Sequence, residues 1–211
     1  MDFLRQLHDP EGLKHLIAAG SYLLLFGIIF AETGLLIGFF LPGDSLLFIA
    51  GFMAANAQKL GVNLSIGPLI LLLCMAAIAG DSVGYLIGRK AGPALFRRED
   101  SRFFKRKHLQ SAQDFYDKHG PKTIVLARFV PIVRTFAPTV AGAAGMNYRQ
   151  FLTYNIVGGI GWIASMLLLG YFLGNVPVIE RNLSKVVIGI VLLSVLPMVW
   201  HAIKEKRAVK A

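Results

Sequence analysis

The chain has 211 residues, of which 55% are hydrophobic, and its 22 lysines and arginines against 12 acidic residues give a formal net charge of +10. Its apolar residues stand in long blocks rather than in short amphipathic periods, so we expect an all-α, polytopic integral membrane protein instead of a soluble domain. The basic residues stand beside these blocks, as cytoplasmic loops require, and no nucleic-acid-binding module accompanies them, so a nucleic-acid partner is not expected.

Four apolar segments are long enough to cross a membrane. A bilayer core about 30 Å thick is crossed by a helix of about 20 residues. The predicted full spans are residues 15–31, 66–88, 150–174 and 184–203. Two further apolar stretches, 33–55 and 123–146, are each interrupted by Pro or Gly and contain a charge. We predict that these two form re-entrant hairpins, which enter and leave the membrane on the same side.

The basic residues predict the topology. Residues 89–122 carry ten basic residues against four acidic ones, and the tail from residue 204 is also basic, so both are expected to be cytoplasmic. The last two spans supply the even number of crossings between them, which leaves the hairpin 123–146 entering from the cytoplasm. With a cytoplasmic N-terminus, the hairpin 33–55 enters from outside. The linker 93–122 is predicted to be an interfacial helix, with a solvated loop as the alternative.

Three short motifs recur at offsets of 89, 91 and 86 residues. They are FLP and FVP at residues 40–42 and 129–131, AG and AG at 50–51 and 141–142, and GYLIG and GYFLG at 84–88 and 170–174. We therefore predict one membrane domain, residues 1–211, containing a repeat at about 32–92 and another at about 123–175. Each repeat holds one hairpin and one span, so the second copy is inverted, as in many transporters.

Charged residues inside the apolar segments divide by sign between the two repeats. The set consists of Glu32, Asp44 and Asp81 in the first repeat and Arg128, Arg134 and Arg149 in the second. A charge at the bilayer centre costs about 3 kcal/mol on insertion scales, so such residues face a cavity or a partner. Because the signs are complementary, the candidate site consists of Glu32, Asp44, Asp81, Arg128 and Arg134.

Proline and glycine are expected to break the hairpins and aim these charges. The predicted breaks are Pro42, Gly43, Pro131 and Pro138. Asp44 directly follows the first break, and Arg128 and Arg134 stand on either side of Pro131. Because proline lacks a donor and glycine permits a sharp turn, both hairpins can bend there.

The charges allow two interpretations. In the structural one, Glu32 and Asp44 pair with Arg128 and Arg134 and lock the hairpins together. In the functional one, the arginines bind an anionic head group through their planar fork, while the acids accept protons or cations that drive movement. Both hold if the partners exchange during transport.

Asp81 stands apart from the other acids because glycines surround it. It either faces the same cavity or is hydrogen-bonded between packed helices, since Gly80, Gly84 and Gly88 form a small-residue face that favours packing. Tyr85 and Arg89 are interpreted as anchors at the membrane interface. The single cysteine, Cys74, and the scattered histidines predict no metal site and no other cofactor.

Three stretches together resemble the DedA family of bacterial inner-membrane proteins, which is related to the VTT-domain lipid scramblases. They are ETGLLIGFFLPGDS at residues 32–45, GDSVGYLIGRK at 80–90 and RFVPIVRTFAPTVAGAAGMN at 128–147. The resemblance covers nearly the whole chain. It implies opposed re-entrant hairpins and translocation of a polyprenyl phosphate, undecaprenyl phosphate, across the inner membrane, coupled to the proton motive force. It also places the family's essential charges on Glu32, Asp44, Arg128 and Arg134.

The sequence thus predicts a multi-pass transporter of the inner membrane with cytoplasmic termini. Arg128 and Arg134 hold the phosphate, while Glu32, Asp44 and Asp81 couple transport to protons or Na⁺. The expected partners are the polyprenyl phosphate and other membrane lipids, with a homo-oligomer left open. The alternatives are a small-cation/proton antiporter using the acids as ligands, a lipid phosphatase, and a structural adaptor. A phosphatase is not expected, because no histidine lies in the charged segments to act as a base.

Overall fold

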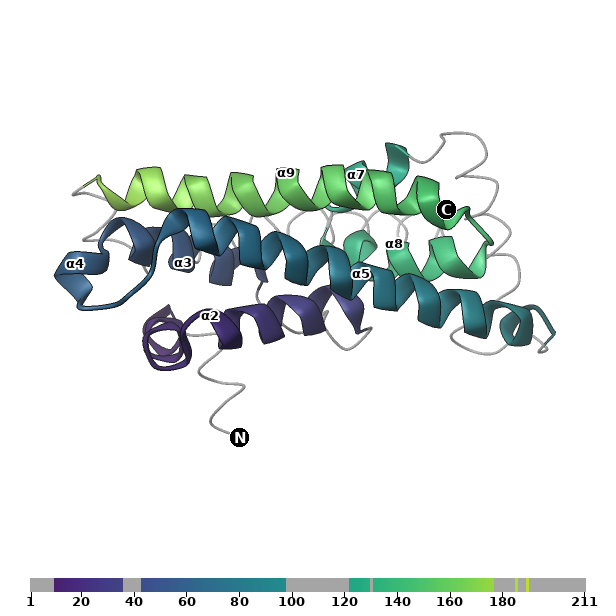
Figure 1. The fold of residues 1–211 in the computed structure, drawn as a ribbon, viewed down its shortest axis with the longest axis horizontal. Coiled ribbons are helices and arrows are strands. Elements are labelled where there is room, and N and C mark those ends of the chain that lie inside the picture. Colours follow the sequence, from purple (N-terminus) through teal and green to yellow (C-terminus); the bar gives the residue numbers. More distant parts are fainter. Residues whose placement is uncertain are drawn as a thin grey trace, which may run out of the picture. The chain divides into compact units, whose positions relative to one another are not determined.

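The computed structural model describes residues 10–35, 43–97, 122–129 and 131–176, together with residues 185 and 189. Regular structure in these ranges is entirely helical, as the sequence predicts (Figure 1). The helices are α2 (Pro10–Gly34), α3 (Gly43–Ala55), α4 (Ala57–Leu60), α5 (Ile66–Arg97), α7 (Lys122–Ala127), α8 (Pro131–Ala143) and α9 (Tyr148–Gly174). Apart from residues 185 and 189, the predicted span 184–203 lies outside the described residues, as does most of the linker 93–122.

Within the described ranges, two helices are long and apolar enough to cross a membrane, namely Ile66–Ala91 of α5 and the whole of α9. They match the predicted spans 66–88 and 150–174. Large apolar side chains on both helices are exposed, including Leu71 and Phe172, which suits a surface bathed in lipid. The helix α5 itself continues beyond the predicted span to Arg97, through good helix formers such as Ala91 and Leu95.

The predicted hairpins are described unequally. In the second, a turn at Arg128 and Phe129 follows α7, and α8 begins at Pro131, one of the predicted breaks. In the first, Gly43 is the first residue of α3, whereas Pro42 lies outside the described residues. Whether either hairpin is re-entrant stays a prediction.

The predicted break at Pro138 is wrong, because α8 runs through it. A proline inside a helix removes one hydrogen bond, and packing of the helix against α5 offsets this cost. Pro138 faces Gly84 of α5, where a Cβ would lie 3.5 Å from the Pro138 Cβ, an ordinary van der Waals distance. The chain turns only after α8, at Gly145, whose φ of +75° is one that glycine adopts without strain.

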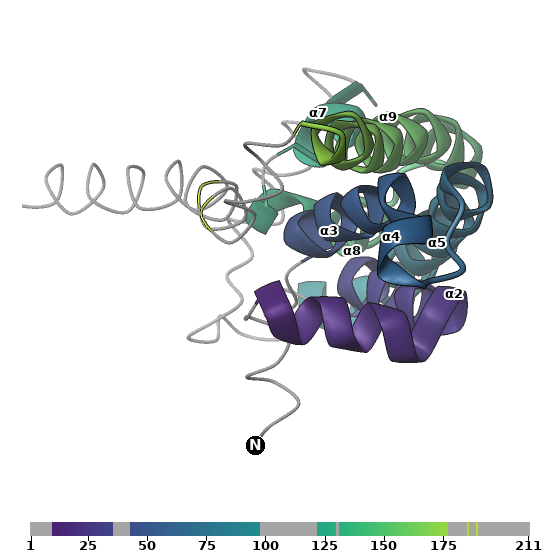
Figure 2. The same cartoon turned by 90° about the vertical axis from the view of Figure 1, so that its left-hand side faces the viewer.

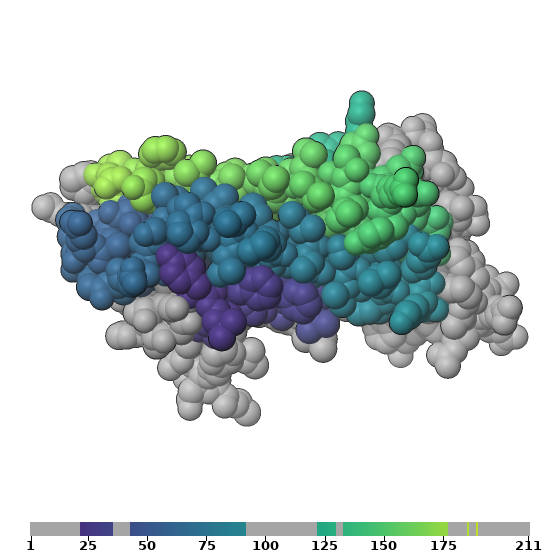
Figure 3. Space-filling model, viewed as in Figure 1, coloured from purple at the N-terminus to yellow at the C-terminus, as the bar shows by residue number. Residues whose placement is uncertain are grey.

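The chain folds into two compact units, and α2, α5 and α9 each pass from one to the other. The first unit contains α3, α4, the start of α5 and the end of α9. The second contains the end of α2, most of α5, α7, α8 and the larger part of α9. In the second unit, α5 and α9 lie against each other and run in opposite directions (Figures 1 and 3).

A glycine crossing joins α8 to α5 in the second unit. A Cβ on Gly88 would overlap the Thr139 carbonyl oxygen, and a Cβ on Gly142 would overlap the Tyr85 carbonyl oxygen. The two contacts follow opposite sequence order, so these helices are antiparallel. Only glycine allows the backbones to approach this closely.

The first unit contains the same arrangement between α3 and α9, which lie together in Figure 2. A Cβ on Gly51 would overlap the Leu167 carbonyl oxygen, and a Cβ on Gly170 would overlap the Phe48 carbonyl oxygen. Each short helix therefore crosses, antiparallel, the long helix of the other predicted repeat. The duplication itself stays a prediction, and these matching crossings are the packing that it would produce.

Candidate functional site

A buried ion pair joins Arg128 and Asp81 in the second unit. Asp81 lies midway along α5, and Arg128 lies in the turn after α7. The Nη2 of Arg128 donates to the Asp81 carboxylate, and the two side chains are 4% and 5% exposed. The same Nη2 donates to the Oδ1 of Asn155 on α9. A buried arginine is thus shared between one acidic and one neutral acceptor.

Gly158 of α9 makes room for Arg128, and Gly159 lies beside the same side chain. A Cβ on Gly158 would lie 2.9 Å from the Arg128 Cδ, and a Cβ on Gly159 would lie 3.6 Å from its Cζ. The arginine side chain therefore lies flat against the backbone of α9. Within the described part of the chain, its buried Nε has no hydrogen-bond acceptor. This donor lies on the same edge of the guanidinium group as Nη2, which an oxyanion can bind side-on.

A second ion pair joins Arg134, in the first turn of α8, to Glu32, in the last turn of α2. The Arg134 Nη2 lies 2.5 Å from the Glu32 Oε1, and the side chains are 10% and 2% exposed. The Arg134 Cζ also lies 4.5 Å from the centre of the Trp162 ring on α9. This arginine, like the first, touches both an acid and an uncharged side chain of α9.

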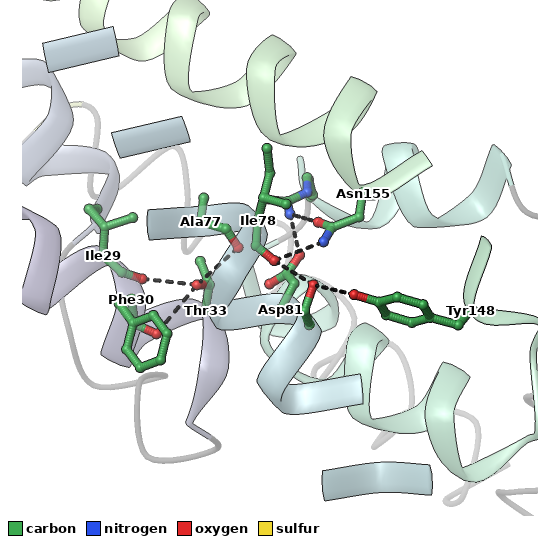
Figure 4. A network of polar contacts seen from close by, with 10 residues as sticks. Ile29, Phe30, Thr33, Ala77, Ile78, Asp81, Tyr148 and Asn155 are labelled. Atoms are coloured by element: carbon green, nitrogen blue, oxygen red, sulfur yellow. Dashed lines mark hydrogen bonds and ion pairs between the residues drawn. The ribbon is translucent and has the colours of Figure 1, made fainter. Parts of the chain in front are cut away.

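Close packing of α2 on α5 sets the position of Glu32. The neighbouring Thr33 donates from Oγ1 to the Ile29 carbonyl at 3.0 Å, and the Ala77 carbonyl lies 3.4 Å from the same oxygen (Figure 4). A Cβ on Gly80 would overlap the Thr33 Oγ1. The predicted packing role of this glycine face is therefore confirmed.

The two pairs form a charge-balanced set in a low-dielectric environment. Two guanidinium groups face two carboxylates, so no net charge is buried. Removing one partner from such a pair leaves an uncompensated buried charge, which costs about 3–5 kcal/mol. An incoming anion can therefore bind the arginines only if the acids withdraw or are neutralised.

Comparisons with known proteins point to one family. The VTT domain model matches residues 41–172. Protein DedA of Escherichia coli strain K12 is 46% identical over 211 residues, covering 99% of this chain and 94% of that protein. An uncharacterized membrane protein of Mycobacterium leprae is 44% identical, covering 93% and 86%. The inner membrane protein YqjA of E. coli K12 is 35% identical, covering 95% and 92%.

This chain belongs to the DedA family. The resemblance inferred from its motifs is thereby confirmed, and with it the assignment to a family of membrane proteins. No solved structure matches the chain.

The DedA-family motifs contain the charges of both pairs, and Asp81 joins Glu32 among the acids that the arginines bind. Arg134 does pair with Glu32, whereas the acid on Arg128 is Asp81. Asp44 lies in the first turn of α3, in the other compact unit, and is half-buried. Asp81 is bonded to Arg128 and buried, as the packing interpretation expects, while its place in a cavity stays a prediction. Arg149 is exposed at the start of α9.

Sequence reasoning missed the uncharged partners of the arginines. Asn155 is fully buried and Trp162 is 2% exposed, but neither carries a charge that would mark it inside an apolar span. Their spacing of seven residues, which places both on one face of α9, is the only sequence signal.

Tyr85 is also misassigned as an interfacial anchor. It is fully buried, its hydroxyl donates to the Met146 carbonyl, and its ring packs 4.7 Å from that of Phe151. Among the described residues, no three His, Cys, Asp or Glu side chains gather to hold a metal ion.

Proposed function

We propose that this DedA-family protein moves an anionic polyprenyl phosphate, undecaprenyl phosphate, across the bacterial inner membrane and so supports cell-envelope synthesis. Its E. coli relative YqjA is named an inner membrane protein, which supports this location. We further propose that the proton motive force drives the movement.

The charge-balanced set of two arginines and two acids carries the proposal. Arg128 and Arg134 offer planar guanidinium groups, which match phosphate oxygens better than an ammonium group does. Arg128 and Arg134 both belong to the second predicted hairpin, residues 123–146. One head group bound between them would therefore contact this single hairpin. The polyprenyl tail would remain in the surrounding lipid, because it has no polar group that needs shielding from the lipid.

Coupling to protons follows from charge balance. A phosphate monoester carries about 1.5 to 2 negative charges near pH 7. When the phosphate replaces the acids on the arginines, Glu32 and Asp81 would be left as unpaired buried charges unless they bind protons. Uptake of about two protons with each phosphate keeps the site neutral. When these protons are released on the other side of the membrane, the acids regain their charge and the arginines can release the phosphate. Na⁺ would balance the charge equally well, so the transport assay includes vesicles with and without Na⁺.

The test is translocation of labelled undecaprenyl phosphate between the leaflets of proteoliposomes under an imposed pH gradient. We expect the unmodified protein to accelerate translocation and Arg134→Ala to abolish it while the protein stays monodisperse. The matched control is Arg149→Ala, which removes an exposed arginine and should keep the wild-type rate. Equal rates for Arg134→Ala and the unmodified protein would contradict the head-group assignment.

The antiporter alternative makes the opposite prediction in the same vesicles. Without polyprenyl phosphate, a cation/proton antiporter would still change the internal pH when Na⁺ or K⁺ is added. The lipid transporter would not.

A further inference from the structure

Helix α9 holds the two arginines through side chains that carry no charge. Asn155 accepts a hydrogen bond from Arg128, and Trp162 lies under the guanidinium group of Arg134. Seven residues separate them, so they share one face of α9 two turns apart. The acids come from other helices, Glu32 from α2 and Asp81 from α5.

Asn155 is itself fixed in place. Its Nδ2 donates to the Ile78 carbonyl of α5 at 3.1 Å, which turns its Oδ1 toward Arg128 (Figure 4). This contact involves an amide and a carbonyl, so it does not change when a nearby carboxylate gains or loses a proton. Gly158 and Gly159, between Asn155 and Trp162, keep the Arg128 stem against the same helix.

Trp162 restricts Arg134 in a complementary way. A guanidinium group stacked on an indole ring presents its edge, and with it its N–H donors, to whatever lies beside the ring. Glu32 occupies that edge in this structure. The ring contact involves no atom of the acid, so loss of Glu32 from Arg134 would not by itself remove it.

We propose that Asn155 and Trp162 are positioning residues, which keep Arg128 and Arg134 in place while the acids exchange with the phosphate. The transport part of this inference rests on the proposed function. Two long, flexible cations released from their acids would otherwise adopt many rotamers, and ordering them again would weaken phosphate binding. Asn155 and Trp162 avoid this loss. Because they carry no charge, they do not compete with the phosphate for the charge of the arginines.

The first test does not require transport. The chain has two tryptophans, so a Trp200→Phe background leaves Trp162 as the only one. In that background, Arg134→Ala should shift the Trp162 emission, because the cation above the ring is lost. Glu32→Met, and Glu32→Gln as a better-tolerated second variant, should leave the emission of the parent unchanged. A shift in both Glu32 variants as large as that of Arg134→Ala would overturn the proposal.

The second test measures translocation as a function of undecaprenyl phosphate content. Trp162→Leu should raise the half-saturating lipid content roughly three- to thirtyfold, the range spanned by a desolvated cation–π contact, with the rate at saturation nearly unchanged. Trp162→Phe keeps an aromatic face and should recover most of the loss. Phe172→Leu, which removes an exposed aromatic ring from the same helix, is the control and should behave as wild type.

Asn155→Ala should likewise raise the half-saturating content, by about tenfold or more, because a charged donor loses its neutral acceptor. Thr153→Ala, which removes an exposed hydroxyl bonded within α9, is its control. A fall in the saturated rate with no change in half-saturation would overturn the positioning role. If the unmodified protein does not translocate the lipid at all, the proposed function fails, while the fluorescence test still decides whether Trp162 holds Arg134.

Discussion

Arg128 and Asp81 form a pair in which either residue alone is costly to remove. Both side chains are at least 95% buried, and Asn155 cannot neutralise a charge. We predict that Arg128→Met and Asp81→Asn each lower the free energy of unfolding by about 3–5 kcal/mol, because each leaves one uncompensated buried charge. The double variant should lose clearly less than the sum. Denaturant unfolding in detergent, followed by circular dichroism, measures all three.

Arg149→Met is the matched control for this cycle. It removes an exposed arginine at the start of α9 and should change the free energy of unfolding by no more than about 0.5 kcal/mol. Strictly additive losses in the double variant would show that Arg128 and Asp81 do not stabilise each other.

At the residue scale, the sequence predicts the charged residues of the candidate site more reliably than it predicts which residues they contact. Arg128, Arg134 and Glu32 are conspicuous because charges are costly in apolar segments. The pairing of Arg128 with Asp81 depends on how the turn after α7 packs against α5, and short-range patterns do not encode this. In the sequence, nothing distinguishes Trp162 from other aromatic residues of a membrane span. Its contact with Arg134 is visible only in the structure.

At the scale of elements, glycine determines how the helices cross. Gly88 and Gly142 bring α5 and α8 together, as Gly51 and Gly170 bring α3 and α9 together. We predict that an alanine at any of these four positions reduces the yield of monodisperse protein and its melting temperature in detergent, because the new Cβ would overlap a backbone carbonyl that cannot move aside. The losses should be similar at the two crossings.

Glycines that face open space provide the controls for this series. A Cβ on Gly67 of α5 or Gly161 of α9 would meet nothing within 4 Å. Alanine at these positions should be neutral or slightly stabilising, since it favours helix over glycine by up to about 1 kcal/mol. Equal losses at Gly67 and Gly88 would indicate a general cost of replacing glycine and not a close crossing.

The elements differ in how well the sequence predicts them. The starts of α5 and α9 fall within two residues of the predicted spans, because apolar length is a strong signal. Pro138 misleads because its missing hydrogen bond is a local cost, whereas the packing of α8 against α5 is a tertiary gain that no local rule counts. The continuation of α5 to Arg97 was not predicted, because the apolar length that marks a span says nothing about how far the helix extends beyond it.

For the whole molecule, the crossings link the two predicted repeats. The short helix α3 of the first repeat packs on α9 of the second, and α8 of the second packs on α5 of the first. Each short helix therefore depends on the other repeat for its closest partner. This exchange explains why the compact units do not coincide with the repeats: each unit contains parts of both.

The opposite directions of α5 and α9 lead to a topology prediction. In the second unit, Ile78 lies beside Gly159 and Tyr85 beside Phe151, so the two helices are antiparallel. If both cross the membrane, the residue before α5 and the residue after α9 lie on one side. We therefore expect Asn63→Cys and Asn175→Cys, at exposed positions, to react with an impermeant thiol reagent from the outside of intact cells.

The opposite ends of the same helices should be protected. Asn147→Cys, which precedes α9, and Ser101→Cys, in the basic segment after α5, should react only after the membrane is permeabilised, because basic segments stay in the cytoplasm. A Cys74→Ala background removes the one native thiol. Labelling of Asn63→Cys and Asn175→Cys from opposite sides would mean that α5 and α9 do not both cross, since antiparallel helices that both cross must have these two ends on the same side.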